Sequence, residues 1–468
     1  MHMEQDALGE VGVPDDVYYG AQTQRAKENF PISGRGIPEG LIRALGLLKG
    51  AAARANRELG LLPAHLADAM VQAAAEVAEG KLSAHFVVDV FQTGSGTSSH
   101  MNANEVIAKR TNELLTGQRQ SKTPAHPNDH VNLGQSSNDV FPTAIHLAAL
   151  RALNDDLLPA LAQLRDELTV KARAFDGIVK IGRTHGQDAT PVRLGQEFAG
   201  YARMIERGRQ RLVESRPLLE EVPLGATAVG TGLNTSPEFA RRALAVIHEQ
   251  TGLSLRPAEN YFEALGSRHA LVATSGALKT LACDLMKIAN DLRWLSSGPR
   301  CGLGEITLPA LQPGSSMMPG KVNPVIPEAV CQVAARVMGN DLAVTVAGQS
   351  GWLELNVMMP LLADSLLEAI ALLANSSRLL ARRCVAGIEA QAERCQHWVE
   401  ESLALATALA PRIGYDAAAR LAQQAYQQGR TIRAVAQEAT DLSAEELAHL
   451  LDAKRMTGHP ATPCAISR

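Results

Sequence analysis

Aromatic residues, cysteines and an excess of either charge are all scarce in this sequence of 468 residues. It contains 8 Phe, 6 Tyr and 3 Trp, and most of its apolar residues are Ala, Leu and Val. Strands favour aromatic and β-branched residues, whereas helices favour Ala and Leu. The composition therefore predicts an all-α fold.

The charge is nearly balanced, with 45 basic and 49 acidic side chains and a net charge of −4. Nucleic acids and acidic membrane surfaces bind basic fields, so we expect neither as a partner. The longest charge-free runs have 15 or 16 residues and are rich in Gly, Ser, Thr, Asn and Pro. Such runs are too short and too polar to cross a membrane.

Cysteines are few, and no pair of them has C-x-x-C spacing. This pattern indicates neither a disulfide framework nor a zinc or iron–sulfur site, and it favours reduced thiols. The N-terminal segment MHMEQDALGEVGVP has no apolar core and no Arg-rich stretch, so we expect no export or transit signal and a cytoplasmic location. The cysteines are Cys283, Cys301, Cys331, Cys384, Cys395 and Cys464.

Apolar residues recur at steps of three and four in several long segments, which predicts amphipathic helices. Pro159, inside the first of them, predicts a kink. Long helices with this spacing between about 138 and 390 predict a central elongated bundle. The segments are 150–168, 194–219, 278–295, 330–344 and 362–380.

The rest of the chain differs from this bundle in character. Residues 1–137 contain helix-forming stretches broken by Gly and Pro, and shorter helices follow position 395. We therefore predict an N-terminal mixed helical domain (1–137), a central bundle domain (138–394) and a small C-terminal helical domain (395–468).

Charge is absent from several loops that are rich in glycine and small hydroxyl residues. Such loops offer neutral hydrogen-bond donors and free backbone N–H groups, and at helix N-termini they bind anions. Each loop alone could equally be an ordinary capped turn, but together they favour an anion site. The charge-free or nearly charge-free loops are 90–104, 126–139, 182–188, 222–237 and 306–320.

The segment GSSMMPGKVN at 314–323 is the most specific of these loops. A catalytic serine needs a base or a positive environment, which Lys321 and nearby N–H groups could supply. A phosphate-binding P-loop is not indicated because Val322 follows the lysine, and no G-x-S-x-G hydrolase elbow is present. The single E-x-x-H pair, Glu446 to His449, falls short of a di-iron or zinc motif.

Five segments carry a resemblance to known enzymes. GSSMMPGKVNP at 314–324 resembles the signature loop of the fumarase/aspartase superfamily, and the other blocks resemble those of class II fumarate hydratases. The similarity extends from GAQTQRAKENFPIS at 20–33 to IGYDAAA at 413–419. The other blocks are TGSGTSSHMNANEV at 93–106, HPNDHVNLGQSSNDVFPT at 126–143, GRTHGQDATP at 182–191 and GTGLNT at 230–235.

The resemblance implies a homotetramer in which long central helices form a twenty-helix core and each active site is shared by three subunits. It implies reversible trans-hydration of fumarate to (S)-malate, a small dicarboxylate, without a metal or another cofactor. Within the superfamily, Ser137 and Gly320 favour a fumarase, whereas 322–330 resembles fumarases and aspartases alike. Aspartate ammonia-lyase or a related dicarboxylate lyase is the alternative enzyme, and a non-catalytic helical scaffold is the alternative of another class.

The resemblance also implies roles for individual residues. Ser315 would remove the C3 proton of malate, and His185, paired with Glu328, would act through a water on the C2 hydroxyl. Lys321 and Asn323 would stabilise the developing aci-carboxylate. The implied substrate-binding residues are Ser95, Thr97, Ser136, Ser137, Asn138, Thr184, Ser316, Lys321 and Asn323. The implied secondary anion site consists of His126, Asn128 and Asp129.

Three positions depart from the pattern of the resemblance. His100 stands where the family commonly has Asn, one turn from Thr97, and could add a titrating group near the site. Gly186 replaces a usual Leu beside His185. Thr123 occupies a position where some fumarases place a basic residue of the secondary site.

Overall fold

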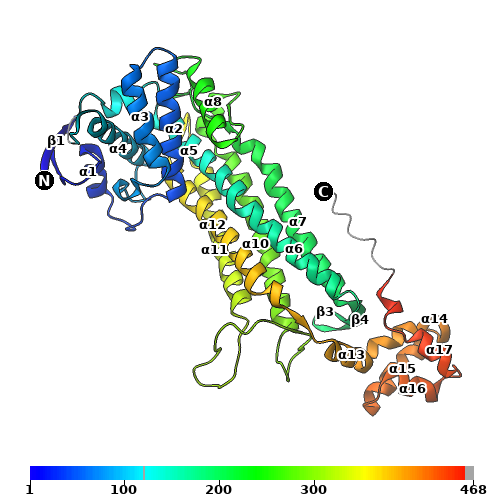
Figure 1. Ribbon diagram of the computed structural model, residues 1–468. Helices are drawn as coiled ribbons and strands as arrows, with labels where there is room; N and C mark the ends of the chain where they lie inside the picture. Colours follow the sequence, from blue (N-terminus) through cyan, green and yellow to red (C-terminus); the bar gives the residue numbers. More distant parts are fainter. Residues whose placement is uncertain (120–121, 459–468) are drawn as a thin grey trace. The chain divides into compact units, whose positions relative to one another are not determined.

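The computed structural model describes residues 1–119 and 122–458 and is predominantly helical (Figure 1). The predicted all-α class is confirmed, because the strands in the described residues form only small two-stranded sheets. The chain divides into two compact units, which are treated separately below. Unit 1 contains residues 1–159, 210–282 and 334–374, and unit 2 contains residues 160–209, 283–333 and the chain from 375 onward. The division into three domains stays a prediction.

Unit 1 is built mainly from helices of the N-terminal part of the chain. Its elements are β1 (His2–Asp6), β2 (Gly9–Val13), α1 (Ala21–Asn29), α2 (Glu39–Glu58), α3 (Ala64–Ala78), η1 (Ser83–His85), α4 (Thr97–Thr116), η2 (Pro127–Val131), α5 (Ser137–Arg151), η3 (Ala152–Leu157), β5 (Glu221–Val222), α8 (Phe239–Thr251), β6 (Arg256–Pro257), α9 (Tyr261–Gly266), β8 (Gly351–Trp352) and β9 (Leu355–Asn356).

Helix α2 is the packing partner of several neighbours in unit 1. It lies beside α3, drawn in blue in Figure 1, and it also contacts α5 and α8. Gly46 allows the closest approach, since a Cβ there would lie 2.5 Å from the backbone nitrogen of Ala78. Helix α5 is buried almost all round, so the residues at its N-terminus are held on a rigid element.

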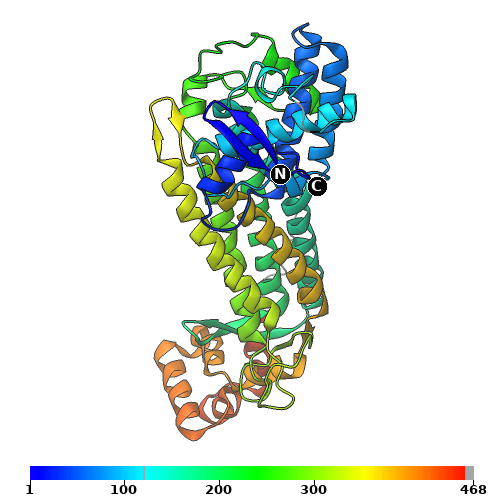
Figure 2. The same cartoon turned by 90° about the vertical axis from the view of Figure 1, so that its left-hand side faces the viewer.

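The antiparallel hairpin of β1 and β2, dark blue in Figure 2, was not predicted from the sequence. The buried position of β1 is occupied by Glu4, which forms an ion pair with the buried Lys109 and accepts a hydrogen bond from the backbone N–H of Ala21. A strand whose buried side chain is a carboxylate shows no apolar alternation, so the usual sequence signal is missing.

Unit 2 carries a β-hairpin and the C-terminal helices. Its elements are α6 (Leu158–Ala174), whose first two residues belong to unit 1, β3 (Val179–Thr184), β4 (Gln187–Arg193), β7 (Ile306–Thr307), η4 (Val385–Gly387), β10 (Glu389–Ala390), α13 (Ala392–Glu401), η5 (Leu403–Ala408), α14 (Ala410–Ile413), α15 (Tyr415–Gln428), α16 (Ile432–Ala439), α17 (Ala444–Leu450) and η6 (Arg455–Thr457). The C-terminal helices enclose a core that includes Leu405, Leu421, Ile432 and Val435.

The remaining long helices contribute residues to both units. They are α7 (Leu194–Leu219), α10 (His269–Leu295), α11 (Val325–Gly348) and α12 (Met359–Arg383). They match the predicted amphipathic segments, and the stripe on α10 that includes Leu278, Leu285 and Leu292 is buried. The segment predicted as one helix over 150–168 is divided among the end of α5, the π-helical stretch η3 and α6, which begins one residue before Pro159. The kink at Pro159 stays a prediction.

Within the described residues, the segment Met359–Gly387 is long and apolar enough to cross a membrane by length and composition. Of its most apolar window, 67% is buried inside the structure, which is the behaviour of a core helix.

Candidate active site

The N-terminus of α4 is reached through a glycine-rich turn at residues 93–96. A Cβ on Gly94 would lie 1.6 Å from the carbonyl oxygen of Val357, and a Cβ on Gly96 would lie 2.5 Å from the ring of Phe141. Gly96 also has a φ of 74° and caps α4 without any side-chain hydrogen bond. Both glycines are therefore required by close packing. In the first turn of α4 the N–H of Ser99 donates to Oε1 of Gln92 at 2.9 Å, and Gly96 offers no capping side chain to the N–H groups before it.

Two helix N-termini meet through a chain of hydroxyl groups. The Oγ atom of Ser95 lies 2.7 Å from Oγ1 of Thr97, which lies 2.7 Å from Oγ of Ser137. Thr97 is the first residue of α4 and Ser137 is the first residue of α5. The structure thus brings together three of the predicted substrate-binding residues at a place where helix dipoles favour an anion.

Ser136 and Asp139 form a capping box at the start of α5. The backbone N–H of Ser136 donates to Oδ1 of Asp139, and the N–H of Asn138 donates to Oγ of Ser136. The other carboxylate oxygen of Asp139 accepts from the N–H groups of Gly225 and Thr227. Burial raises the pKa of Asp139 to about 6 despite these donors. Asp139 therefore joins the 136–138 segment to the 222–237 loop, which the sequence had also singled out.

Asn138 makes the second contact with that loop. Its Nδ2 donates to the carbonyl oxygen of Ala228 at 2.8 Å. The predicted residues Ser95, Thr97, Ser136, Ser137 and Asn138 therefore belong to one connected region of unit 1, as do Asp139 and residues 225–228.

Lys49 lies behind this region and was not among the residues predicted from the sequence. Its side chain is fully buried in α2, and its Nζ lies 2.7 Å from Nε2 of His100. Burial lowers the pKa of Lys49 to about 7. Burial also holds the pKa of His100 well below its usual range. A usable signal was present, since Lys49 interrupts the apolar stripe that contains Leu45 and Ala52.

The predicted secondary anion residues lie at the start of η2. His126 caps this element, its Nδ1 accepting from the N–H groups of Asn128 and Asp129 at 3.3 and 3.2 Å. His126 and Asn128 line a pocket of about 410 Å³ together with Lys122. The residue next to Thr123 in the chain thus supplies an ammonium group to this pocket.

His185 lies at the tip of the β3–β4 hairpin in unit 2. His185 and Gly186 have φ values of 57° and 71°, and Thr184 pairs with Gln187. This is a two-residue turn with positive φ at both central positions, for which glycine in the second place is favourable. Thr184 and His185 are exposed, so the hairpin presents both side chains outward.

The 314–323 loop of unit 2 is closed by its own hydrogen bonds. The N–H of Gly314 donates to the carbonyl oxygen of Lys321 at 2.7 Å, and Nδ2 of Asn323 donates to the carbonyl oxygen of Gly314 at 2.6 Å. A Cβ on Gly314 would lie 2.7 Å from the backbone nitrogen of Asn323. The close approach of the two ends of the loop therefore requires glycine at this position.

Ser315 receives two backbone donors inside this loop. The N–H groups of Met317 and Met318 donate to Oγ of Ser315 at 3.1 and 2.9 Å. Ser316 and Lys321 are exposed, and Glu328 follows in the first turn of α11. Donors aimed at a hydroxyl oxygen stabilise its deprotonated form.

The residues of unit 2 are not joined as those of unit 1 are. Among the described residues, no hydrogen bond or ion pair connects His185 with Glu328 or either of them with Ser315. The catalytic roles of these three residues, and the binding roles of Thr184, Ser316, Lys321 and Asn323, stay predictions.

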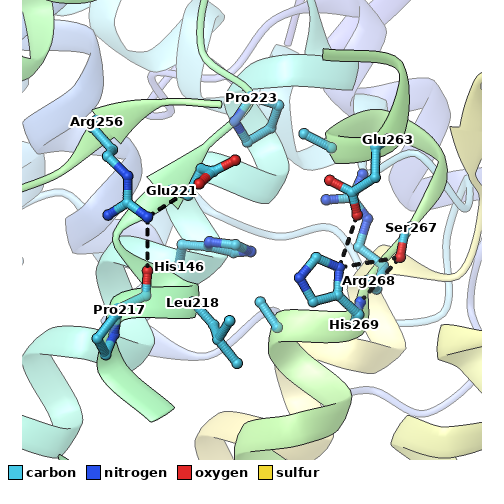
Figure 3. Close-up of a pocket in the computed structure, with 12 residues that line it drawn as sticks. His146, Pro217, Leu218, Glu221, Pro223, Arg256, Glu263, Ser267, Arg268 and His269 are labelled. Carbon is cyan, nitrogen blue, oxygen red and sulfur yellow. Dashed lines mark hydrogen bonds and ion pairs between the residues drawn. The ribbon is translucent and has the colours of Figure 1, made fainter. Parts of the chain in front are cut away.

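A further pocket in unit 1, of about 80 Å³, contains none of the predicted site residues. His146 and Arg256 face it from one side in Figure 3, and Glu263 and His269 face it from the other. Glu263 pairs with His269 at 2.8 Å and Glu221 pairs with Arg256 at 3.1 Å. The charged groups of this pocket largely neutralise one another.

Within residues 1–119 and 122–458, no group of three or more His, Cys, Asp and Glu side chains could hold a metal ion. The cysteines in this part of the chain are unpaired, and burial raises the pKa of both Cys384 and Cys395 to about 12. Cys464 lies outside the described residues.

Comparison with known proteins supports the resemblance seen in the motifs. The family described as Lyase matches residues 9–339, and the family described as Fumarase C C-terminus matches residues 405–458. The chain is 52% identical to a class II fumarate hydratase of Xylella fastidiosa, over 97% of this chain and 95% of that protein. It is 55% identical to a class II fumarate hydratase of Mycobacterium tuberculosis, over 92% and 90% of the two chains.

A solved structure agrees with these relatives. The crystal structure of the class II fumarase from Schistosoma mansoni matches with a TM-score of 0.95 and 40% sequence identity, covering 97% of this chain and 99% of that chain. The fold and the enzyme class predicted from the motifs are thereby confirmed. The chain belongs to the class II fumarate hydratases, a family of lyases.

Proposed function

We propose that this enzyme hydrates fumarate to (S)-malate reversibly, and that one substrate carboxylate binds where α4 and α5 begin. The hydroxyl chain of Ser95, Thr97 and Ser137 carries this proposal, because it lies where the N-termini of two helices meet. No acidic side chain occupies the first turn of α4. The hydroxyl donors and the two helix dipoles together suit a carboxylate.

Ser315 acts as the base in the dehydration direction. The two N–H groups that donate to its Oγ favour the oxyanion form, which removes the C3 proton of malate. The resulting aci-carboxylate carries additional negative charge, and Lys321 and Asn323 stabilise it. Ser316 contacts the same end of the substrate.

His185 completes the reaction at C2. In dehydration it delivers a proton through a water molecule to the departing hydroxyl group, and in hydration it accepts that proton again. Glu328 orients the imidazole and stabilises its charged form, and Thr184 contacts the substrate next to it. Their pairing joins different subunits, in keeping with the proposed sharing of each active site.

The enzyme is a homotetramer with a twenty-helix core, and each active site takes residues from three subunits. Several apolar side chains support an interface, since Leu342, Trp352 and Leu353 are 66%, 79% and 89% exposed in the single chain. His126, Asn128 and Asp129 form the secondary anion site, with Lys122 as its cation. The enzyme acts in the cytoplasm.

An absorbance assay for fumarate tests the proposed reaction. Purified enzyme should form fumarate from malate and form none from aspartate. Fumarate from aspartate alone would establish the ammonia-lyase alternative, and no fumarate from either substrate would favour the scaffold. Sedimentation should give four times the chain mass of 49.8 kDa. A monomer that retains full activity would refute the shared sites.

A further inference from the structure

The buried ammonium group of Lys49 is held by neutral acceptors only. Lys49 is 1% exposed, and its three protons meet Nε2 of His100 at 2.7 Å, Oε1 of Gln135 at 2.9 Å and Oδ1 of Asn132 at 3.3 Å. Buried charges are usually paired, since leaving water costs an isolated ion several kcal/mol. All three acceptors here are uncharged.

No carboxylate in the described residues lies within ion-pair distance of Lys49. Asp139 is the acid whose field acts on Lys49. However, its two oxygens already accept backbone N–H groups from Ser136, Gly225 and Thr227. The positive charge of Lys49 is therefore only partly compensated by the chain itself.

Lys49 also fixes the segment that leads into the proposed carboxylate site. With Oε1 accepting from Lys49, the amide of Gln135 turns its Nε2 toward the carbonyl oxygens of Val131 and Leu133 at 3.1 and 3.2 Å. With Oδ1 accepting from Lys49, Asn132 donates to the carbonyl oxygen of Gln135 at 3.2 Å. The next residue after Gln135 is Ser136, which caps α5.

We propose that Lys49 is a positioning residue that makes this site select doubly charged over singly charged ligands. Its ammonium holds residues 132–135 in place and places behind the site a positive charge that attracts a ligand with two negative charges more strongly than a ligand with one. The inference rests on the proposed function, because it takes Ser136–Asn138 as part of the substrate site. Lys49 acts through Gln135 and the start of α5 and does not touch the substrate.

The titration of Lys49 gives the proposal a pH dependence. The titratable groups that face it are His100 on α4 and Asp139 on α5, and the 132–135 segment presents only amide and backbone groups. His100 accepts through Nε2, so it is neutral and carries its proton on Nδ1. Since the pKa of Lys49 is about 7, the ammonium is present below that pH and lost above it. Dianion affinity should therefore fall as the pH rises through 7.

Calorimetric titration of the full-length enzyme tests this directly. The ligands are succinate, which carries two charges, and succinamate, which carries one, each at pH 6.5 and pH 8.5. At pH 6.5, Lys49→Met should weaken succinate binding about tenfold and succinamate binding by less than about threefold. The control Lys81→Met removes an exposed lysine paired with Glu79 and should bind as the wild type does.

Equal losses for the two ligands in Lys49→Met would overturn the proposal, because a merely structural role would affect both alike. An unchanged pH slope in that variant would assign the slope to another group and would also overturn the proposal. Binding is measured without turnover, so these outcomes are independent of the malate assay that tests the proposed function.

Two substitutions of His100 keep the proposal testable if Lys49→Met fails to fold. His100→Asn retains an acceptor for Lys49 and should keep the wild-type pH midpoint of succinate binding. His100→Leu removes that acceptor, so the ammonium should lose its proton more readily and the midpoint should move to lower pH. The same midpoint in all three proteins would contradict the role of Lys49.

Discussion

Oγ1 of Thr97 lies 2.7 Å from Oγ of Ser137, so the first residues of α4 and α5 share one hydrogen bond. Neither hydroxyl group belongs to a regular helical ladder, and both lie at the positive ends of helix dipoles. This contact couples two segments that are 40 residues apart in the chain.

Removing either hydroxyl group should lower kcat/KM. Removing both should lower kcat/KM by a smaller factor than the product of the two single losses. We expect Thr97→Val and Ser137→Ala each to lower kcat/KM roughly tenfold, the value of about one hydrogen bond. The double variant measures their coupling, expected at about 0.5–1.5 kcal/mol. Thr116→Val, at the other end of α4, is the control. Strictly multiplicative losses would show that the two hydroxyl groups act separately.

Ser315→Ala should lower kcat by about 10²–10⁴-fold, because it removes the proposed base but leaves the loop hydrogen bonds of Gly314 and Asn323 intact. Ser316→Ala is the matched neighbour and should raise KM more than it lowers kcat. Steady-state kinetics with malate and fumarate measure both effects. Near wild-type turnover in Ser315→Ala would refute its assignment as the base.

His185→Asn should remove the imidazole and leave the hairpin turn intact. Asparagine tolerates positive φ, and Asn followed by Gly is a favourable pair for a two-residue hairpin turn. The variant should therefore keep its thermal midpoint while kcat falls about 10²–10⁴-fold. In contrast, Gly186→Ala should cost roughly 1 kcal/mol of local stability and retain the imidazole. Full activity in His185→Asn would exclude an acid–base role for His185.

Gly96→Ala and Gly117→Ala compare the two ends of α4. Both glycines have positive φ, at 74° and 71°, but only Gly96 faces a ring at 2.5 Å while nothing lies within 4 Å of a Cβ at Gly117. We expect urea denaturation to show a loss of about 1 kcal/mol for Gly117→Ala and about 3 kcal/mol or more for Gly96→Ala. Similar losses at both sites would mean that Phe141 can move aside at little cost.

The pKa of Asp139, raised from 3.8 to about 6, predicts how stability changes with pH. Between these values the folded chain binds more protons at this site than the unfolded chain, so its contribution to stability falls as the pH rises. The difference in unfolding free energy between the wild type and Asp139→Asn should therefore decrease by roughly 3 kcal/mol in total between about pH 3 and pH 7 and then level off. A difference that increases with pH would show that the backbone donors lower this pKa.

The sequence predicted the helices well because their stripes report burial directly. Leu278, Leu285 and Leu292 on α10 lie where the periodicity placed them. The N-terminal hairpin was missed for the opposite reason. The buried side chain of its first strand is Glu4, whose burial depends on Lys109, about a hundred residues away in the chain. Local patterns cannot express such a long-range ion pair.

The candidate site likewise contains residues that the sequence predicted and residues that it did not. The scarcity of charge marked the loops at 90–104 and 222–237 because their hydroxyl and backbone N–H groups are donors that can bind a carboxylate. Lys49 was missed, since a lysine in an apolar stripe is ordinarily read as an interruption of the buried face. The proposed positioning role of Lys49 depends on its hydrogen bonds to His100 and Gln135, which lie 51 and 86 residues away in the chain. The proposed pairing of His185 with Glu328 joins two subunits, and the pattern of residues along one chain does not predict such a contact.

Gly94 has a further consequence through its contact with Val357. The carbonyl oxygen of Gly94 also accepts a hydrogen bond from the N–H of Met359, the first residue of α12, at 2.9 Å. The turn that presents Ser95 and the start of a long core helix are therefore tied together at the backbone. A fluctuation that opens the turn must break this bond, so its amide proton should exchange with solvent in one cooperative step with the turn. The Met359 amide is thus a natural reporter, in hydrogen exchange, of how often the carboxylate site opens.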